Sequence, residues 1–203
     1  MHRASRRRNK SFVQVDCVTT APELLERELF GFEKGAFDGA VSNKIAGLET
    51  ADKGTLFLNE IARFPLDLQP KLVHLLERGE FERLGTSRTL RVNVRLIAAT
   101  RHDVAKWIAG NRFRQDLYDQ FNTSLIQIPP LRERREDIPL LAHHFMQRFA
   151  RRMNKDIQVI APETIFVLVN HDWPGNVTQL EHFIQRSVIL TKGPRLQAPL
   201  DEL

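Results

Sequence analysis

Residues 55–60 read Thr-Leu-Phe-Leu-Asn-Glu. A short, continuous apolar run of this kind is typical of a central parallel strand that is covered on both faces. Asn59 and Glu60 end the run, so we expect them at the carboxyl end of the strand, the edge where open α/β sheets bind ligands. A strand that turns polar because it reaches the surface would look the same, and this stretch alone does not separate the two interpretations.

The segments on either side of this strand alternate between strand and helix patterns. Residues 11–17 alternate like a half-buried strand, residues 92–99 form a second buried strand, and residues 125–128 form a last strand that Pro129 and Pro130 stop. Helical patterns occupy residues 22–30, 43–52, 68–78, 103–109 and 112–121, and residues 80–94 alternate like a hairpin. Strands that alternate with helices predict an α/β fold with a parallel sheet.

Two details of these helices depend on proline. Pro22 suits the first turn of the helix that it opens. Pro70 would break the interior of a helix, so we expect Asp67 as the N-cap of residues 68–78, which places Pro70 in the first turn.

The pattern becomes wholly helical after residue 131. A charged link over residues 132–137 leads to helical segments at 138–152, 163–170 and 177–190. Asn176 followed by Gln179 resembles a capping box at the start of the last helix. We therefore predict two domains, an α/β domain over residues 1–131 and a small helical domain over residues 132–203.

Composition places the chain among ordinary globular proteins. Of its 203 residues, 42% are hydrophobic and 27% charged. There is no apolar run of the ~20 residues that a membrane span needs, and no secretory segment follows Met1, so we expect a cytoplasmic protein without membrane contact. The single cysteine, Cys17, lies in an apolar alternation that predicts a small buried core residue rather than a nucleophile.

The net charge of +5 comes in part from a basic run near the start of the chain. Such a run can contact nucleic acid, but a solvated terminus is the more ordinary explanation. The run consists of Arg3, Arg6, Arg7, Arg8 and Lys10.

A glycine-bracketed stretch lies between the first two helical segments. It consists of Gly35, Ala36, Phe37, Asp38, Gly39 and Ala40. Glycines at both ends predict a tight, mobile loop, and an aromatic side chain at the tip of such a loop is suited to contacting a partner. The alternative is an ordinary turn with Phe37 folded back toward the core.

Five stretches together are similar to one protein family, the AAA+ central domain of sigma-54-dependent transcriptional activators, also known as bacterial enhancer-binding proteins. The stretches lie in the family's order and cover essentially the whole chain. Residues 28–40 resemble the signature loop, 54–61 the Walker B strand, 113–118 the arginine-finger helix, 129–134 the interdomain link and 173–177 the start of the sensor II helix.

This resemblance implies an AAA+ P-loop NTPase-type parallel sheet followed by a small α-helical lid. The family forms ring hexamers that hydrolyse ATP with Mg²⁺ between subunits, so the implied partners include further AAA+ subunits in a homo- or hetero-hexamer. The loop at residues 35–40 corresponds to the loop that contacts sigma-54 RNA polymerase. DNA binding in the family belongs to a separate C-terminal domain.

Some catalytic positions of the family are retained here. Glu60 takes the place of the glutamate that orients water, and Arg114 that of the first finger arginine, which acts on a neighbouring subunit. Gln120 occupies the position of the second finger arginine. Phe37 matches the aromatic tip of the contact loop, although Asp38 follows it in place of a threonine.

Other nucleotide-handling positions differ from the family. Asn59 stands where an aspartate helps to hold Mg²⁺, and an amide offers that ion a carbonyl oxygen but no charge. Asp16 replaces an asparagine that gates the glutamate, so two acids are expected to meet there. Arg101 replaces the sensor I asparagine, and Thr178 replaces the sensor II arginine.

None of the ten glycines is followed by lysine, so the chain contains no Walker A phosphate loop, and we expect the sheet to lack the family's first strand. From the altered positions we expect an ATPase-deficient, degenerate relative that binds or regulates the transcription machinery. One alternative is a functional ATP-dependent activator domain whose phosphate loop lies upstream of Met1. The other is a non-catalytic regulator that binds DNA or a partner protein.

Overall fold

The computed structural model describes residues 1–203, which divide into two compact units, Met1–Leu125 and Ile126–Leu203. Each unit has its own hydrophobic core, and each is described by itself. The domain boundary expected at residue 131 stays a prediction. No helix is long and apolar enough to cross a bilayer.

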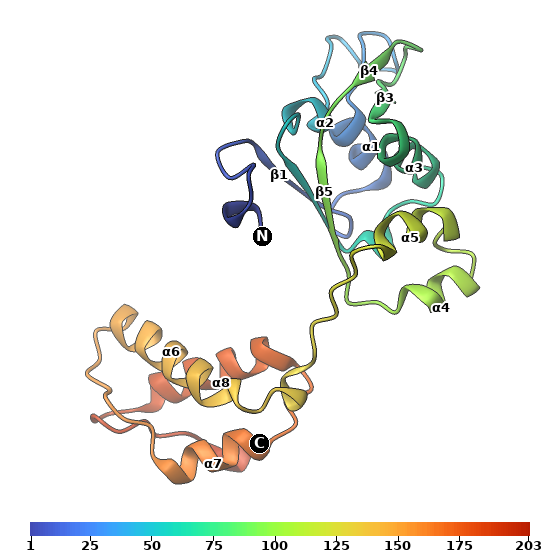
Figure 1. Ribbon diagram of the computed structural model, residues 1–203. Coiled ribbons are helices and arrows are strands. Elements are labelled where there is room, and N and C mark those ends of the chain that lie inside the picture. Colours follow the sequence, from blue (N-terminus) through green and yellow to red (C-terminus); the bar gives the residue numbers. More distant parts are fainter. The chain divides into compact units, whose positions relative to one another are not determined.

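The first unit contains a three-stranded parallel sheet in the order β1-β2-β5, as the sequence predicts (Figure 1). Its strands are β1 (Phe12–Asp16), β2 (Thr55–Asn59) and β5 (Arg95–Ala99). β2 is the central strand. Its first residue is preceded by Gly54, where an added Cβ would lie 2.2 Å from the carbonyl oxygen of Ser11, so a side chain there would push β1 and β2 apart.

Five helices accompany the sheet: α1 (Pro22–Phe30), α2 (Gly47–Thr50), α3 (Gln69–Arg78), α4 (Val104–Ala109) and α5 (Gln115–Asn122). Pro22 begins α1, and Pro70 lies in the first turn of α3, as expected. The N-cap of α3 is Leu68 rather than Asp67, and no side chain caps this helix. α2 is shorter than expected because residues 43–46 are taken up by the strand-like pairing of Lys44.

The core of the first unit lies against one face of the sheet. Leu56 and Leu58 point into it and are fully buried among residues of α1, α2, α3 and α5. On the other face Phe57 is half-buried and stacks on Phe12, which is 48% exposed. The expectation of a strand covered on both faces therefore holds fully for one face only, because the second face is covered by few neighbours, such as Phe12 and the His2 ring, which lies 5.1 Å from that of Phe12.

The last strand expected in the α/β part is absent. Residues 125–128 have no regular secondary structure and pair with no strand. A strand needs a neighbour for its backbone hydrogen bonds, and β5 is paired only with β2. The apolar side chains of Leu125, Ile126 and Ile128 are consequently 66%, 67% and 75% exposed.

The basic run is held more firmly than a solvated terminus would be. The Arg7 guanidinium donates to the carbonyl oxygens of Gly54 and Asn93, at 2.9 and 2.6 Å, and to the Asn93 side chain at 2.6 Å. It therefore ties the first ten residues to the starts of β2 and β5. The other basic side chains of the run are exposed.

An antiparallel hairpin of β3 (Glu80–Glu82) and β4 (Thr89–Arg91) lies where the sequence predicts it. Its turn pairs with the base of the loop between α1 and α2, because Phe32 bridges to both Leu84 and Lys44. Figure 1 shows this loop and the hairpin at the same end of the unit. The hairpin thus supports the segment that holds Phe37.

The second unit packs three helices, α6 (Asp137–Arg152), α7 (Pro162–Asn170) and α8 (Asn176–Leu190), around a core that includes the fully buried Trp173. The Trp173 indole donates to the carbonyl oxygen of Leu168 at 2.7 Å. The predicted capping box is only half formed. Gln179 accepts a hydrogen bond from the Gly175 N–H, while the Asn176 side chain instead accepts one from the Leu131 N–H.

Glu49 links α2 to the hairpin through Arg83. The Arg83 Nε and Nη2 atoms donate to its two carboxylate oxygens at 2.9 and 2.7 Å, and this pairing lowers the pKa of Glu49 despite the opposing effect of burial. We expect Glu49→Gln to lower the free energy of unfolding by about 1–2 kcal/mol at neutral pH.

The pH dependence follows from the sign of that shift. A lowered pKa stabilises the fold above the ordinary value of 4.5, and this stabilisation is lost as the pH falls through the folded-state pKa. The difference between wild type and Glu49→Gln should therefore shrink in acid, as urea unfolding at several pH values would measure. Glu77→Gln, an exposed site without an ion pair, is the control. An undiminished difference below pH 4 would contradict the assignment.

Cys17 is buried, as the sequence predicts, and 6% exposed. Burial, with smaller contributions from Asp16 and Glu60, raises the pKa of Cys17 from 9.0 to about 12. We expect a thiol reagent at neutral pH to label the folded protein roughly 10³-fold more slowly than the urea-unfolded protein, because the thiolate is the reactive form. Equally fast labelling of folded and unfolded protein would show that Cys17 is accessible and ionised.

Candidate functional site

The carboxyl edge of the sheet brings together four of the predicted site residues. Asp16 and Asn59 are register partners at the ends of β1 and β2. Glu60 follows Asn59, and Arg101 follows β5 by two residues, so both reach the same edge. Parallel strands in register place their carboxyl ends side by side, which is the reason that residues 85 positions apart can meet here.

Asp16 and Asn59 bind each other. The Asn59 Nδ2 atom donates to Asp16 Oδ2 at 2.7 Å, and the backbone N–H groups of Val18 and Thr19 donate to Asp16 Oδ1 at 2.8 and 3.1 Å. The Asn59 hydrogen bond, followed by those two, lowers the pKa of Asp16. The expected meeting of two acids is corrected accordingly, because Asp16 pairs with the amide of Asn59 and not with Glu60.

Glu60 is engaged by the residues that follow β5. It has a left-handed backbone with φ 55°, and its side chain is 13% exposed. Arg101 Nε lies 3.2 Å from Glu60 Oε1, and the Thr100 hydroxyl donates to Oε2 at 3.3 Å. The carboxylate is therefore ion-paired within its own chain.

His102, which the sequence did not single out, also lies at this edge. Its Nε2 atom is buried, has no hydrogen-bond partner and lies 3.9 Å from Glu60 Oε2. Its ring also contacts Trp107, with 5.0 Å between ring centroids. The signal available in the sequence was its place two residues after Thr100, at the end of a predicted strand.

Mg²⁺ prefers carboxylate oxygens that are free to bind it. All four carboxylate oxygens of Asp16 and Glu60 already face protein donors. Asn59 contributes an uncharged amide that is itself donating to Asp16. No group of three or more His, Cys, Asp or Glu side chains is arranged to hold a metal ion. In this arrangement the edge residues do not fit a Mg²⁺ site.

Arg114 lies apart from these four residues, at the N-cap of α5. Its guanidinium donates two hydrogen bonds to the Asp116 carboxylate, from Nη2 to Oδ2 at 2.6 Å and from Nε to Oδ1 at 3.0 Å. This hydrogen bonding raises the pKa of Arg114 and lowers that of Asp116. Both side chains are 44% exposed, and they line an open hollow of about 560 Å³ with Leu66 and Phe113.

Thr178, the remaining nucleotide-site candidate, is exposed on the first turn of α8 in the second unit. It carries no charge for a phosphate group.

The loop at residues 35–40 does not hold Phe37 out at an exposed tip. Two turns close the loop, with Gly35 N–H donating to the Ala40 carbonyl at 2.9 Å and Ala40 N–H donating to that of Phe37 at 3.0 Å. Phe37 is half-buried, whereas Asp38 and Gly39 are exposed at the tip. Phe37 instead folds back onto Arg27 of α1 and Phe32, where its ring gains packing, but it does not join the hydrophobic core.

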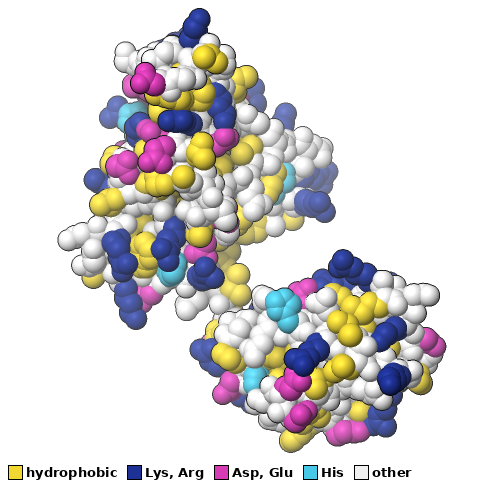
Figure 2. Space-filling view, turned by 180° about the vertical axis from the view of Figure 1, so that it is seen from behind, with side chains coloured by type: hydrophobic (Ala, Val, Ile, Leu, Met, Phe, Trp, Pro, Cys, Tyr) yellow, Lys and Arg dark blue, Asp and Glu magenta, His cyan; other side chains and the backbone are white.

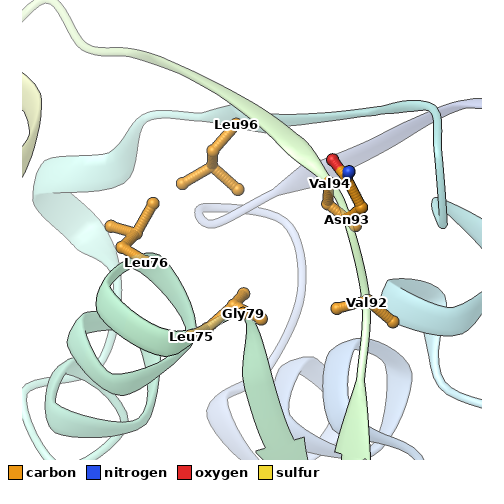
Figure 3. A pocket seen from close by; sticks show the side chains of 7 residues that line it. All are labelled: Leu75, Leu76, Gly79, Val92, Asn93, Val94 and Leu96. Carbon is orange, nitrogen blue, oxygen red and sulfur yellow. The ribbon is translucent and has the colours of Figure 1, made fainter.

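A shallow hollow of about 280 Å³ lies away from the carboxyl edge, between α3 and the start of β5 (Figure 3). It is lined by Leu75, Leu76, Gly79, Val92, Asn93, Val94 and Leu96. Figure 3 shows Leu76 and Leu96 reaching into it from the helix and the strand. Its lining side chains are aliphatic apart from Asn93 and include no charged group that could pair with a phosphate.

The charged side chains on the surface in Figure 2 are spread over both units. Lys and Arg are interspersed with Asp and Glu, and no continuous basic stripe of the kind that tracks a nucleic-acid backbone crosses this face. His143 and His144 on α6 are exposed, as expected for surface positions.

The chain is similar to known protein families and to individual proteins. Residues 1–127 match the family described as the Sigma-54 interaction domain, and residues 132–200 match the AAA+ ATPase lid domain. The chain is 49% identical to the DNA-binding transcriptional activator HyfR of Escherichia coli K12 over 99% of its length and 30% of that of HyfR. It is 48% identical to the formate hydrogenlyase transcriptional activator FhlA of the same organism over 100% of its length and 29% of that of FhlA.

Solved structures are similar as well. NtrX from Brucella abortus superposes with a TM-score of 0.86 at 38% identity, covering 100% of this chain and 46% of NtrX. NtrX in complex with ATP gives the same TM-score at 37% identity, with coverage of 98% and 44%.

The chain spans less than a third of the length of its curated relatives. The match covers more than half of the chain, and the sheet and the helical unit agree with the AAA+ fold of NtrX. The chain therefore belongs to the sigma-54 interaction domain family of transcriptional activators and carries its AAA+ α/β sheet and helical lid.

Proposed function

We propose that this chain binds the sigma-54 form of RNA polymerase through the loop at residues 35–40 and does so without hydrolysing ATP at its own nucleotide edge. The observation that carries the proposal is the loop itself. It lies within the family match, keeps the aromatic Phe37, and rests on a base paired on both sides, to Lys44 and to Leu84. Such a base gives a partner a defined surface to bind.

The nucleotide edge supports the second half of the proposal. Phosphoryl transfer needs a bound metal ion and a carboxylate free to orient water. Here Asn59 offers no charge, and Glu60 is paired with Arg101. Thr178 has no charge to offer a γ-phosphate. ATP and Mg²⁺ belong to the family's chemistry, and the residues that would meet them in this chain are Asp16, Asn59, Glu60 and Arg101.

A second role is favoured by Arg114. Its exposed guanidinium lies outside the chain's own nucleotide edge, where the resemblance places an arginine that acts on a neighbouring subunit. In a homo- or hetero-hexamer of AAA+ subunits this chain would supply Arg114 to a neighbour once Asp116 released it. We assign DNA binding to a domain of the whole activator that is separate from these two units.

Phe37→Ala should weaken binding of the chain to sigma-54 RNA polymerase about tenfold or more, because a buried aromatic contact is a typical hot spot of an interface. Pull-down or biolayer interferometry with purified sigma-54 RNA polymerase measures this. Phe166→Ala on α7, which removes a ring that is 70% exposed, is the matched control and should bind like wild type. Wild-type affinity in Phe37→Ala would refute the loop assignment.

We further expect no ATP turnover above background in the purified chain. A ligand that binds the folded state raises the melting temperature. We therefore also expect ATP and Mg²⁺ to leave the melting temperature of the chain unchanged. A turnover that Glu60→Gln abolishes would contradict this prediction. It would instead favour the alternative, an ATP-dependent activator domain in which Glu60 acts as the base.

A further inference from the structure

Arg27, on the last turn of α1, lies over the ring of Phe37. Its guanidinium carbon is 3.7 Å from the ring centroid, within the range of a cation–π contact. Arg27 forms no ion pair and no side-chain hydrogen bond with any residue of the chain. Its acidic neighbours are already engaged, Glu26 with Lys71 and Glu28 with Lys44. Phe37 is therefore the specific partner that fixes the position of this guanidinium.

Phe32 contacts the same ring edge to face, with 4.9 Å between centroids and 68° between planes. The backbone of Phe32 is anchored, because it exchanges hydrogen bonds with Lys44 at 3.1 and 2.8 Å. Phe37 is thus held between a side chain of α1 and a ring on the paired base of the loop. Both contacts come from elements that do not belong to residues 35–40.

Two glycines flank Phe37, each two residues away along the chain. Gly35 and Gly39 have φ values of 84° and 95°, which only glycine adopts readily. A Cβ added at either position would meet nothing within 4 Å, so the backbone there has open space around it. No neighbouring group at these two glycines would block a change of backbone conformation beside the ring.

We propose that Arg27 and Phe32 form a latch that keeps Phe37 folded against α1, and that partner binding requires the latch to open. The proposal rests on the proposed function in one respect, that Phe37 is the group a partner contacts. The latched ring is half-buried and presents Asp38 and Gly39 instead. Opening exposes the aromatic surface that an apolar pocket on a partner would take up.

An exposed cation–π contact shifts an equilibrium by about two- to fivefold, which sets the size of the effect to be measured. The first measurement uses the free protein. Chymotrypsin cleaves after exposed phenylalanine, and mass spectrometry identifies the product that ends at Phe37. We expect Arg27→Ala and Arg27→Gln, which keeps a polar side chain but removes the charge, to raise the rate of this cleavage about two- to fivefold. Phe32→Ala should also raise it.

Arg63→Ala is the matched control, since Arg63 makes a similar contact with Trp107, 5.2 Å from its centroid, away from the loop. It should leave cleavage at Phe37 unchanged. Circular dichroism and the melting temperature of each variant show whether it is folded. If Arg27→Ala, Arg27→Gln and Phe32→Ala are all folded and all cleave at the wild-type rate, the latch is overturned.

Binding to sigma-54 RNA polymerase is the second measurement, and it separates the latch from the function. With the latch and the function both correct, Arg27→Gln binds about two- to fivefold more tightly than wild type, and Arg63→Ala binds like wild type. Faster cleavage without tighter binding supports the latch and overturns its link to partner binding. If Phe37→Ala then also binds like wild type, the proposed function is what has failed.

Discussion

The register of β1, β2 and β5 is the constraint on which the rest of the first unit depends. Because β2 pairs in parallel with a strand on each side, the residues that follow all three strands converge on one edge. The same pairing leaves one sheet face for the apolar side chains of Leu56 and Leu58, which unite the helices in a single core. Gly54 permits the close approach of the strands at the opposite end.

The chemistry of the carboxyl edge is decided by which donors meet which acceptors. The aspartate at this edge accepts a short hydrogen bond from an asparagine, and the glutamate forms an ion pair with an arginine. With an amide at position 59 and a guanidinium at position 101, both acids of this edge have partners within the chain. The buried Nε2 atom of His102, near the same edge, has no hydrogen-bond partner.

Much of the fold could be predicted from the sequence because the patterns of β2 and of the lid helices are long or strongly apolar. The gathering of Asp16, Asn59, Glu60 and Arg101 followed from the same strand ends. Local pattern could not show how Phe37 packs, since that depends on Arg27 and Phe32 from other segments. It also could not show that residues 125–128 lack a partner, because pairing is a property of neighbours and not of the strand's own sequence.

The proposed function depends on two side chains, Phe37 and Glu60. Phe37 packs against Phe32 and Arg27, and Glu60 is ion-paired with Arg101. The most direct test is the affinity of the purified chain for sigma-54 RNA polymerase, measured with and without ATP and Mg²⁺. The account predicts the same affinity in both conditions. Binding that appears only with ATP and Mg²⁺ would contradict it.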